Sequence, residues 1–130
     1  MNIVEMKDKK QWAETLAAST IVITDFWAGW CQPCLMLGET MKKIMHEDNG
    51  RFEKILIAKI DTESPEFQGL SSEKQISSIP TMFVHLNGKQ VVFRAQDGNT
   101  DRIMGALPRQ SLEMLFETLI KENSKSQEAN

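Results

Sequence analysis

The run Trp30-Cys31-Gln32-Pro33-Cys34 constrains this chain more than any other feature. It holds the only two cysteines of the 130 residues, and it lies where an apolar segment gives way to a helical pattern. Two thiols at positions i and i+3 of a first helical turn are neighbours, so they can open and close a disulfide with little backbone movement. The unpaired N–H groups and the partial positive charge of a helix N-terminus favour a thiolate. The motif therefore predicts a redox-active dithiol.

The two cysteines are expected to differ in role. A cysteine at a helix N-terminus has its pKa lowered to roughly 3.5–7.5, which makes Cys31, at the mouth of the turn, the predicted nucleophile. Cys34 lies one turn further in, so we expect it to be more buried and to attack the mixed disulfide that Cys31 forms. Pro33 lacks an N–H group, which costs nothing in a first turn.

Two other uses of a Cys-x-x-Cys pair fit this sequence less well. A structural zinc site needs four ligands, and the remaining candidates, His46 and His85, lie far apart in the sequence. A purely structural disulfide would close so short a loop that it would constrain the unfolded chain little. We therefore expect no metal, no bound cofactor, and a disulfide that serves the chemistry.

Length and charge narrow the classes of function. A chain of 130 residues predicts one domain, and a 41% share of hydrophobic residues provides for a core. The net charge is −3 and the basic residues are scattered, so no basic stripe indicates nucleic-acid binding. Residues 1–20 show no signal peptide, and no segment is long enough to span a membrane. Two cysteines at redox spacing suit a reducing compartment, so we expect a cytoplasmic location.

The hydrophobic pattern predicts an α/β fold. Segments 21–27 and 55–61 are almost wholly apolar, which is typical of strands buried on both faces. Asn87-Gly88 predicts a tight hairpin turn. The expected strands are 2–6, 21–27, 55–61, 81–86 and 89–93, and the expected helices are 9–18, 32–48, one beginning at Pro65 and one beginning at Pro108. This order predicts parallel and antiparallel strands in one sheet with helices on both faces.

Two polar stretches are expected to lie outside this framework. Segment 95–101 is polar and rich in turn formers, which predicts a loop. The end of the chain is almost free of apolar residues. We therefore expect a single domain over 1–122 and a frayed tail over 123–130.

Taken together, the motifs resemble those of the thioredoxin family. The resemblance covers Ile21 to about Ile120 and rests on Asp25-Phe26-Trp27-Ala28-Gly29-Trp30-Cys31-Gln32-Pro33-Cys34, Ala58-Lys59-Ile60-Asp61, Ile79-Pro80-Thr81, Asn87-Gly88 and Gly105-Ala106-Leu107. It implies the thioredoxin fold, a central five-stranded mixed sheet flanked by four helices. It also implies a thiol–disulfide oxidoreductase that reduces protein disulfides and is then itself reduced by a thioredoxin reductase using NADPH. A lowered cysteine pKa is a general property of this family.

Asp25 is an anomaly in its apolar strand. Desolvation of a buried carboxyl raises its pKa towards neutral pH, and the helix that follows the strand can bring Cys34 near it. The resemblance assigns this position the role of a general base that takes a proton from Cys34. An Asp25 side chain that turns outward to water is the alternative. Lys59 resembles the family lysine near that aspartate, although its ammonium could instead reach the surface.

The resemblance also implies a substrate-binding surface around the sulfur atoms. The family has a cis proline facing its cysteines, which implies a cis Ile79–Pro80 peptide here and a backbone at Ile79 that can bond an incoming peptide. Trp30, Ile79 and Gly105-Ala106 would form a small apolar platform beside Cys31. An exposed Trp30 beside a reactive thiol favours a docking role over a packing role.

Some residues depart from the family pattern at positions that are expected to affect the redox potential. Gln32 stands between the cysteines where glycine is common, and Leu35 replaces a common lysine, which removes a positive charge near the site. Segment 95–101 looks like an insertion. We expect Gln32, Pro33 and Lys59 to tune the redox potential.

The sequence as a whole predicts a monomeric, general protein-disulfide reductase. Two alternatives remain open at this point. One is a reductase dedicated to a single partner, with 95–101 as the specificity element. The other is a redox-insensitive binding or assembly module that uses the surface around Trp30 and Ile79.

Overall fold

A six-stranded mixed sheet, with one strand more than the resemblance implies, organises the computed structural model, which describes the backbone of residues 1–128 and the side chains of residues 1–126. Five of its strands are β1 (Asn2–Glu5), β2 (Ile21–Trp27), β3 (Ile55–Asp61), β4 (Thr81–Leu86) and β5 (Lys89–Gln90), in the order β1-β3-β2-β4-β5, and the sixth, β8 (Ile103–Met104), also pairs with β4. β3 lies parallel to β1 and to β2, whereas β4 runs antiparallel to β2 and to β5. The predicted mixed sheet is confirmed.

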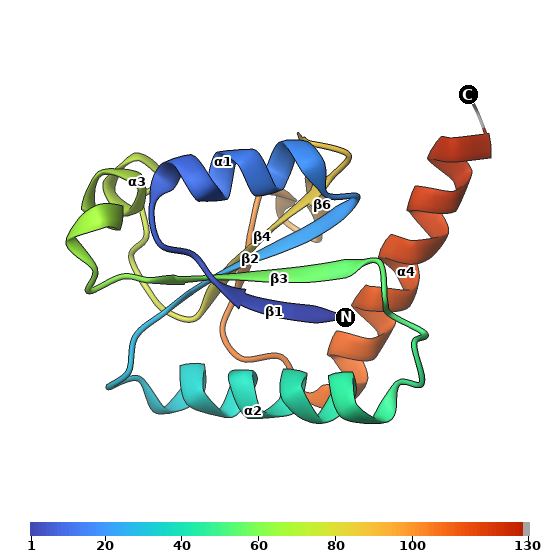
Figure 1. Cartoon of the computed structure of the whole chain (residues 1–130), viewed down its shortest axis with the longest axis horizontal. Helices are drawn as coiled ribbons and strands as arrows, with labels where there is room; N and C mark the ends of the chain where they lie inside the picture. The colour runs from blue at the N-terminus through green and yellow to red at the C-terminus, as the bar shows by residue number, and fades with distance from the viewer. Residues whose placement is uncertain (129–130) are drawn as a thin grey trace.

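Helices cover both faces of this sheet (Figure 1). The described residues form α1 (Lys9–Ala18), α2 (Gln32–Glu47), α3 (Gln68–Glu73) and α4 (Arg109–Glu128), and a 3₁₀ turn, η1 (Pro65–Phe67), leads into α3. α1 and α3 pack on one face, and α2 and α4 pack on the other. Within residues 1–128, no helix combines the length and the apolar character that crossing a membrane requires.

Alternation along β2 separates two apolar cores. Ile21 and Ile23 are fully buried beneath α2 and α4, whereas Val22 and Phe26 are fully buried beneath α1 and α3. Asp25 has the odd-numbered parity of Ile21 and Ile23, so it points to the α2 face. The strand therefore delivers a carboxyl to the side of the sheet that also carries the helix with the cysteines.

The sheet edge beside β4 differs from the sequence-based expectation. The predicted strand over 89–93 is only the two-residue β5, and the chain returns to the other end of β4 as β8 (Ile103–Met104). Between them, β6 (Phe93–Ala95) and β7 (Gly98–Thr100) form a separate two-stranded sheet. Segment 95–101 is therefore the tip and return strand of a hairpin and not an irregular loop. Gly98, at φ +125°, provides the backbone conformation that this tip requires.

α4 continues past the expected boundary at residue 122. Asn123 is buried, and its Oδ1 atom accepts a hydrogen bond of 3.3 Å from Asn87 Nδ2. The structure therefore differs from the predicted frayed tail over 123–128, because a polar contact with the β4–β5 turn extends the packed part of the helix. Residues 129–130 of that predicted tail lie outside the described residues.

Candidate active site

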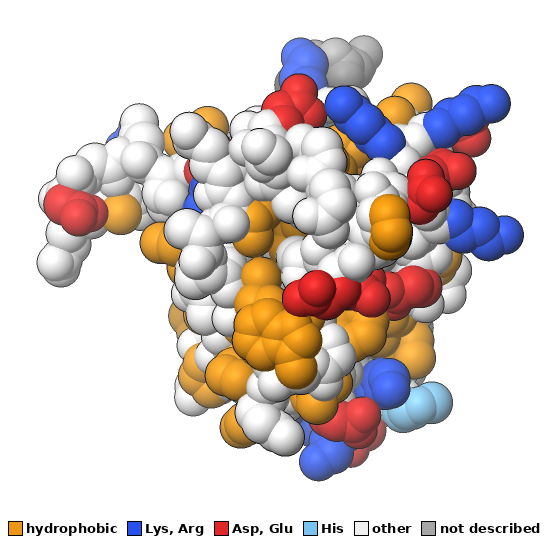
Figure 2. Space-filling model, turned by 90° about the vertical axis from the view of Figure 1, so that its left-hand side faces the viewer, with side chains coloured by type: hydrophobic (Ala, Val, Ile, Leu, Met, Phe, Trp, Pro, Cys, Tyr) orange, Lys and Arg blue, Asp and Glu red, His pale blue; other side chains and the backbone are white. Residues whose placement is uncertain are grey.

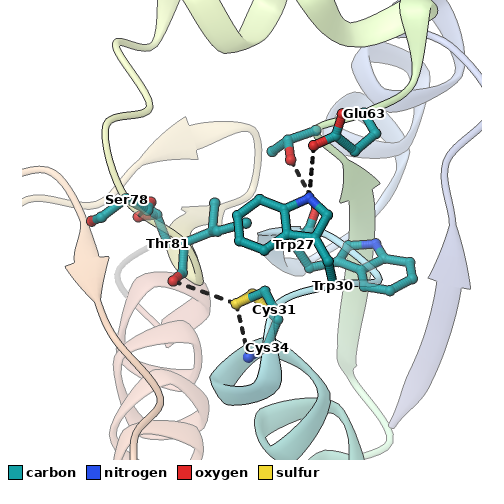
Figure 3. The surroundings of a disulfide bond; sticks show 9 residues. Trp27, Trp30, Cys31, Cys34, Glu63, Ser78 and Thr81 are labelled. Atoms are coloured by element: carbon teal, nitrogen blue, oxygen red, sulfur yellow. Dashed lines mark hydrogen bonds between the residues drawn. A yellow bond between two sulfur atoms is a disulfide. The ribbon is translucent and has the colours of Figure 1, made fainter.

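Cys31 and Cys34 form a disulfide at the start of α2, with Cα atoms 5.2 Å apart (Figure 3). Cys31 is the N-cap of α2, and its Sγ atom accepts a hydrogen bond of 3.3 Å from the backbone N–H of Cys34. An N–H that has no partner within the helix thus points at the sulfur. Cys31 is 5% exposed and Cys34 is 1% exposed, which is the predicted order of burial.

The loop before β4 faces the same sulfur. The carbonyl oxygen of Ile79 lies 3.7 Å from Cys31 Sγ, and the Ile79–Pro80 peptide is cis as expected. The backbone N–H of Gly105 donates a hydrogen bond of 2.9 Å to the carbonyl of Pro80, which holds Gly105 and the exposed Ala106 beside this loop. The structure therefore brings together the predicted residues Cys31, Ile79, Pro80 and Gly105 from segments far apart in the chain, and Ala106 directly follows Gly105.

Trp30 stands beside the disulfide with 69% of its surface exposed. Its indole Nε1 donates a hydrogen bond of 2.8 Å to Glu63 Oε1, which fixes the direction of the ring. A hollow of about 420 Å³ lies beside the ring and is lined by Trp30, Thr62, Gln68, Ser71, Ile76, Ser77, Ser78 and Ile79. Figure 2, which faces this end of the molecule, shows hydrophobic side chains gathered here with acidic side chains alongside.

Sequence reasoning missed Glu63, although a signal for it exists. Trp30 follows β2, and Glu63 follows β3 two residues after its last residue, Asp61. Because β2 and β3 are parallel, their carboxyl ends meet at the same edge of the sheet. A polar residue just beyond either strand could therefore have been expected to approach the other.

Asp25 is fully buried, with 0% of its surface exposed. Neither of its carboxyl oxygens has a hydrogen-bond partner among the described residues. The alternative in which this side chain turns out to water is therefore excluded. Burial away from water raises the pKa of Asp25 from 3.8 to about 7, the Lys59 charge acts to lower it, and the Glu5 charge adds to the rise.

Lys59 lies directly across from Asp25 in the parallel pairing of β3 with β2. Its Nζ atom lies 4.0 Å from the centroid of the Trp27 ring. On the other side, a Cβ atom added to Gly38 of α2 would lie 3.6 Å from the same Nζ. The half-buried ammonium is therefore held between the sheet and α2, near the carboxyl that it influences.

The remaining predicted tuning residues lie on the open side of α2. Gln32 and Pro33 are exposed in its first turn, and Leu35 is 38% exposed. Within the part of the chain that the structure describes, no group of three or more His, Cys, Asp or Glu side chains is arranged to hold a metal ion.

Comparison with known proteins agrees with this geometry. The family model described as Thioredoxin matches residues 3–112. The chain belongs to the thioredoxin family. It is 35% identical over 105 residues to Thioredoxin of Chlorobaculum thiosulfatiphilum, a match that covers 81% of this chain and 84% of that protein. It is 36% identical over 106 residues to Thioredoxin 2 of Chlorobaculum tepidum, which covers 81% of this chain and 84% of that one.

Solved structures show the same fold. A mutant thioredoxin from Halobacterium salinarum superposes with a TM-score of 0.71 at 23% identity, covering 91% of this chain and 90% of that one. Chloroplastic thioredoxin z superposes with a TM-score of 0.70 at 24% identity, covering 93% and 96%. Family membership and the Cys31–Cys34 pair together identify a thiol–disulfide oxidoreductase with protein-disulfide reductase activity.

Proposed function

We propose that this thioredoxin-family protein is a general reductant of protein disulfides in which Cys31 attacks and Cys34 resolves. The observation that carries this assignment is the position of Cys31 Sγ, which accepts the Cys34 N–H and lies 3.7 Å from the carbonyl of Ile79, a residue that lines the open hollow. Cys34 is buried more deeply than Cys31. Only Cys31 is therefore positioned to meet a large substrate.

The reaction is two successive thiol–disulfide exchanges. The Cys31 thiolate of the reduced protein attacks one sulfur of the substrate disulfide, forms a mixed disulfide and releases the other substrate sulfur as a thiolate. The Cys34 thiolate then attacks Cys31 Sγ, closes the internal disulfide and releases the second substrate sulfur. Two electrons pass from the protein dithiol to the substrate, and no bound cofactor takes part.

Asp25 is the proposed base for the second exchange. Cys34 and Gly38 lie on the same face of α2, one turn apart, and Gly38 sits above Lys59, the cross-strand neighbour of Asp25. A carboxyl whose pKa is raised to about 7 is suited to take a proton from the Cys34 thiol near neutral pH. Lys59 limits that rise and thereby tunes the base.

The proposed substrate surface consists of Trp30, Ile79, Pro80, Gly105 and Ala106. Trp30 and Ile79 line the hollow beside Cys31, and Gly105 is bonded to the backbone of Pro80. An extended peptide lying along Ile79 would bring its own sulfur over Cys31. Backbone contacts of this kind are independent of side chains, which suits a reductant with many substrates.

We further propose a thioredoxin reductase that uses NADPH as the electron donor, a cytoplasmic location and a monomeric state. A relative in Mycobacterium leprae, named Bifunctional thioredoxin reductase/thioredoxin, supports such a donor; it is 34% identical over 89 residues, which cover 68% of this chain and 18% of that protein. The restriction of cysteine to the redox pair supports a reducing compartment.

A coupled assay tests the proposal. The protein, a thioredoxin reductase and NADPH are mixed with a small disulfide-bonded protein, and NADPH oxidation is followed. We expect turnover that depends on this protein and is lost in Cys31→Ser. If Cys31→Ser retains the full effect of the protein on its partners, the chain acts as a redox-insensitive module and the proposal fails.

A further inference from the structure

Three charged side chains form one row across the sheet, on the face that α2 covers. In the pairing of β1 with β3, Glu5 lies opposite Lys59, and in the pairing of β3 with β2, Lys59 lies opposite Asp25. Side chains of directly paired residues project to the same face of a sheet. The row therefore runs from the open edge of the sheet at Glu5 to the buried carboxyl of Asp25.

The indole ring of Trp27 contacts both Glu5 and Lys59, the first two members of this row. Its Nε1 atom donates a hydrogen bond of 3.1 Å to Glu5 Oε1, and its face lies 4.0 Å from Lys59 Nζ. The backbone of α2 at Gly38 closes the space above that ammonium. Glu5 thus fixes the Trp27 ring that Lys59 contacts. The ring and Gly38 together determine the position of the Lys59 ammonium relative to Asp25.

We infer that Glu5 is a positioning residue for Asp25. Its carboxylate orients the Trp27 ring under Lys59 and also attracts the Lys59 ammonium, so that Lys59 stabilises the Asp25 carboxylate only in part. This inference rests on the proposed role of Asp25 as the base that activates Cys34. It assigns the first strand of the fold a part in the second exchange, although Glu5 itself touches neither cysteine.

The charges around Glu5 agree in direction with this assignment. The Glu5 side chain is exposed at the edge of the sheet, and its partial desolvation there raises its pKa, while the hydrogen bond from Trp27 and the charge of Lys59 act to lower it and Asp61 adds to the rise. Outside the three members of the row, Asp61 from β3 is the further charged group that acts on Glu5, and α2 contributes the uncharged Gly38. A negative charge on Glu5 disfavours a second negative charge on Asp25 and keeps that carboxyl a stronger base.

Replacement of Glu5 by Gln separates charge from shape. Glu5→Gln keeps an oxygen that can accept the Trp27 N–H and removes only the negative charge. We expect the Asp25 titration midpoint to fall by roughly half a unit to one unit, for charges two strand spacings, about 10 Å, apart in a medium of intermediate dielectric. The midpoint is read from the carboxyl carbon resonance of Asp25 by NMR in the oxidised protein, where no thiol titrates, and Asp25→Asn identifies that resonance.

Glu14→Gln is the matched control. Glu14 is exposed on α1, on the opposite face of the sheet, so its substitution makes the same change in net charge without touching the row. We expect it to leave the Asp25 midpoint unchanged. An equal shift in both variants, or no shift in Glu5→Gln, would overturn the inference.

The rate of the second exchange gives a second readout. Release of a substrate from its mixed disulfide with Cys31 is followed across the pH range in single turnover. Glu5→Gln should move the acidic limb of this profile to lower pH, in step with the Asp25 midpoint. If Asp25→Asn leaves the profile unaltered, the role of Asp25 as the base fails; if only Glu5→Gln leaves it unaltered, the role of Glu5 fails and that of Asp25 stands.

Discussion

The Sγ atom of Cys31 lies 3.3 Å from the backbone nitrogen of Cys34, so an N–H group of the first turn of α2 donates to the sulfur of Cys31. This asymmetry predicts different outcomes for the two serine variants. Cys31→Ser should abolish reduction of a protein disulfide. Cys34→Ser should attack once and then stop as a mixed disulfide, which a non-reducing gel of the reaction reveals.

Alkylation provides an independent check of the same asymmetry. In the reduced protein at mildly acidic pH, iodoacetamide should label Cys31 first, because thiolates react and thiols do not. Peptide mass spectrometry after brief labelling locates the modification. Faster labelling of Cys34 would show that the two roles are reversed.

Asp25→Asn is predicted to change stability in a pH-dependent way. Below about pH 4 the carboxyl is protonated in both the folded and the unfolded chain, so it has little influence on the pH dependence of folding. Between 3.8 and about 7 the folded protein keeps a proton that the unfolded chain has lost, so stability falls as the pH rises and is constant above that range. A rise from 3.8 to about 7 corresponds to about 4 kcal/mol.

Urea unfolding of the oxidised protein at both ends of this range measures the effect. The stability of Asp25→Asn relative to the natural protein should increase by up to about 4 kcal/mol from about pH 4 to about pH 8. The same variant should release substrate from the mixed disulfide more slowly near neutral pH. A constant stability difference together with full turnover would show that Asp25 is not a buried base.

The sequence predicted the parts of the fold in which the hydrophobic pattern is unambiguous. β2 and β3 have the predicted bounds because they are almost wholly apolar, and α1 begins after Asp8 because the Asp8 Oδ1 atom accepts the Gln11 N–H at 2.8 Å. The hydrophobic pattern did not predict the edge of the sheet, where the short strand β5 pairs with one end of β4 and β8 pairs with the other end. Short polar segments carry little information about pairing, because their strands bury almost nothing.

The residues of the candidate site could be predicted only where they belong to a recognisable motif. The cysteines and Asp25 stand out by type and position, and Pro80 is identified through the family resemblance, whereas Glu5 and Glu63 are ordinary acidic residues in the sequence. Their contacts with Trp27 and Trp30 depend on strand order and register, which bring β1 and the end of β3 beside β2. Such contacts become visible only when the sheet is assembled.

The β6–β7 hairpin is predicted to contribute little to stability. Phe93 is paired with Thr100, and the residues between them are exposed. Replacing 94–99 by Asn-Gly should therefore cost at most about 1 kcal/mol, since closure entropy varies slowly with loop length. Urea unfolding measures the cost, and reduction of a generic protein disulfide should persist.

The partner set of that shortened variant tests the alternative of a dedicated reductase. Substrates trapped by Cys34→Ser in the natural background and in the shortened background are compared by mass spectrometry. We expect the same set in both, as a general reductant requires. Loss of a single dominant substrate on shortening would instead identify the hairpin as a specificity element.

The redox potential is predicted to remain that of a reductant, because no added charge stabilises the Cys31 thiolate. Gln32 is neutral and exposed, so any hydrogen bond that its amide donates to the sulfur contributes about 1 kcal/mol or less. For a two-electron couple, 1.4 kcal/mol corresponds to about 30 mV. Gln32→Gly should therefore change the potential by no more than about 30 mV, measured by equilibration with a glutathione buffer.

Leu35→Lys tests whether a positive charge near Cys31 raises the redox potential. A cation in the first turn of α2 would stabilise the thiolate of the reduced form, so the potential should rise and the protein should become a weaker reductant. Met114→Lys is the control, because Met114 is exposed on α4 and receives the same charge far from the sulfur. An equal rise in both variants would trace the effect to net charge and not to the thiolate. If the unaltered dithiol stays largely reduced at the poise of a disulfide isomerase, it is an oxidant or an isomerase, and the general-reductant proposal is wrong.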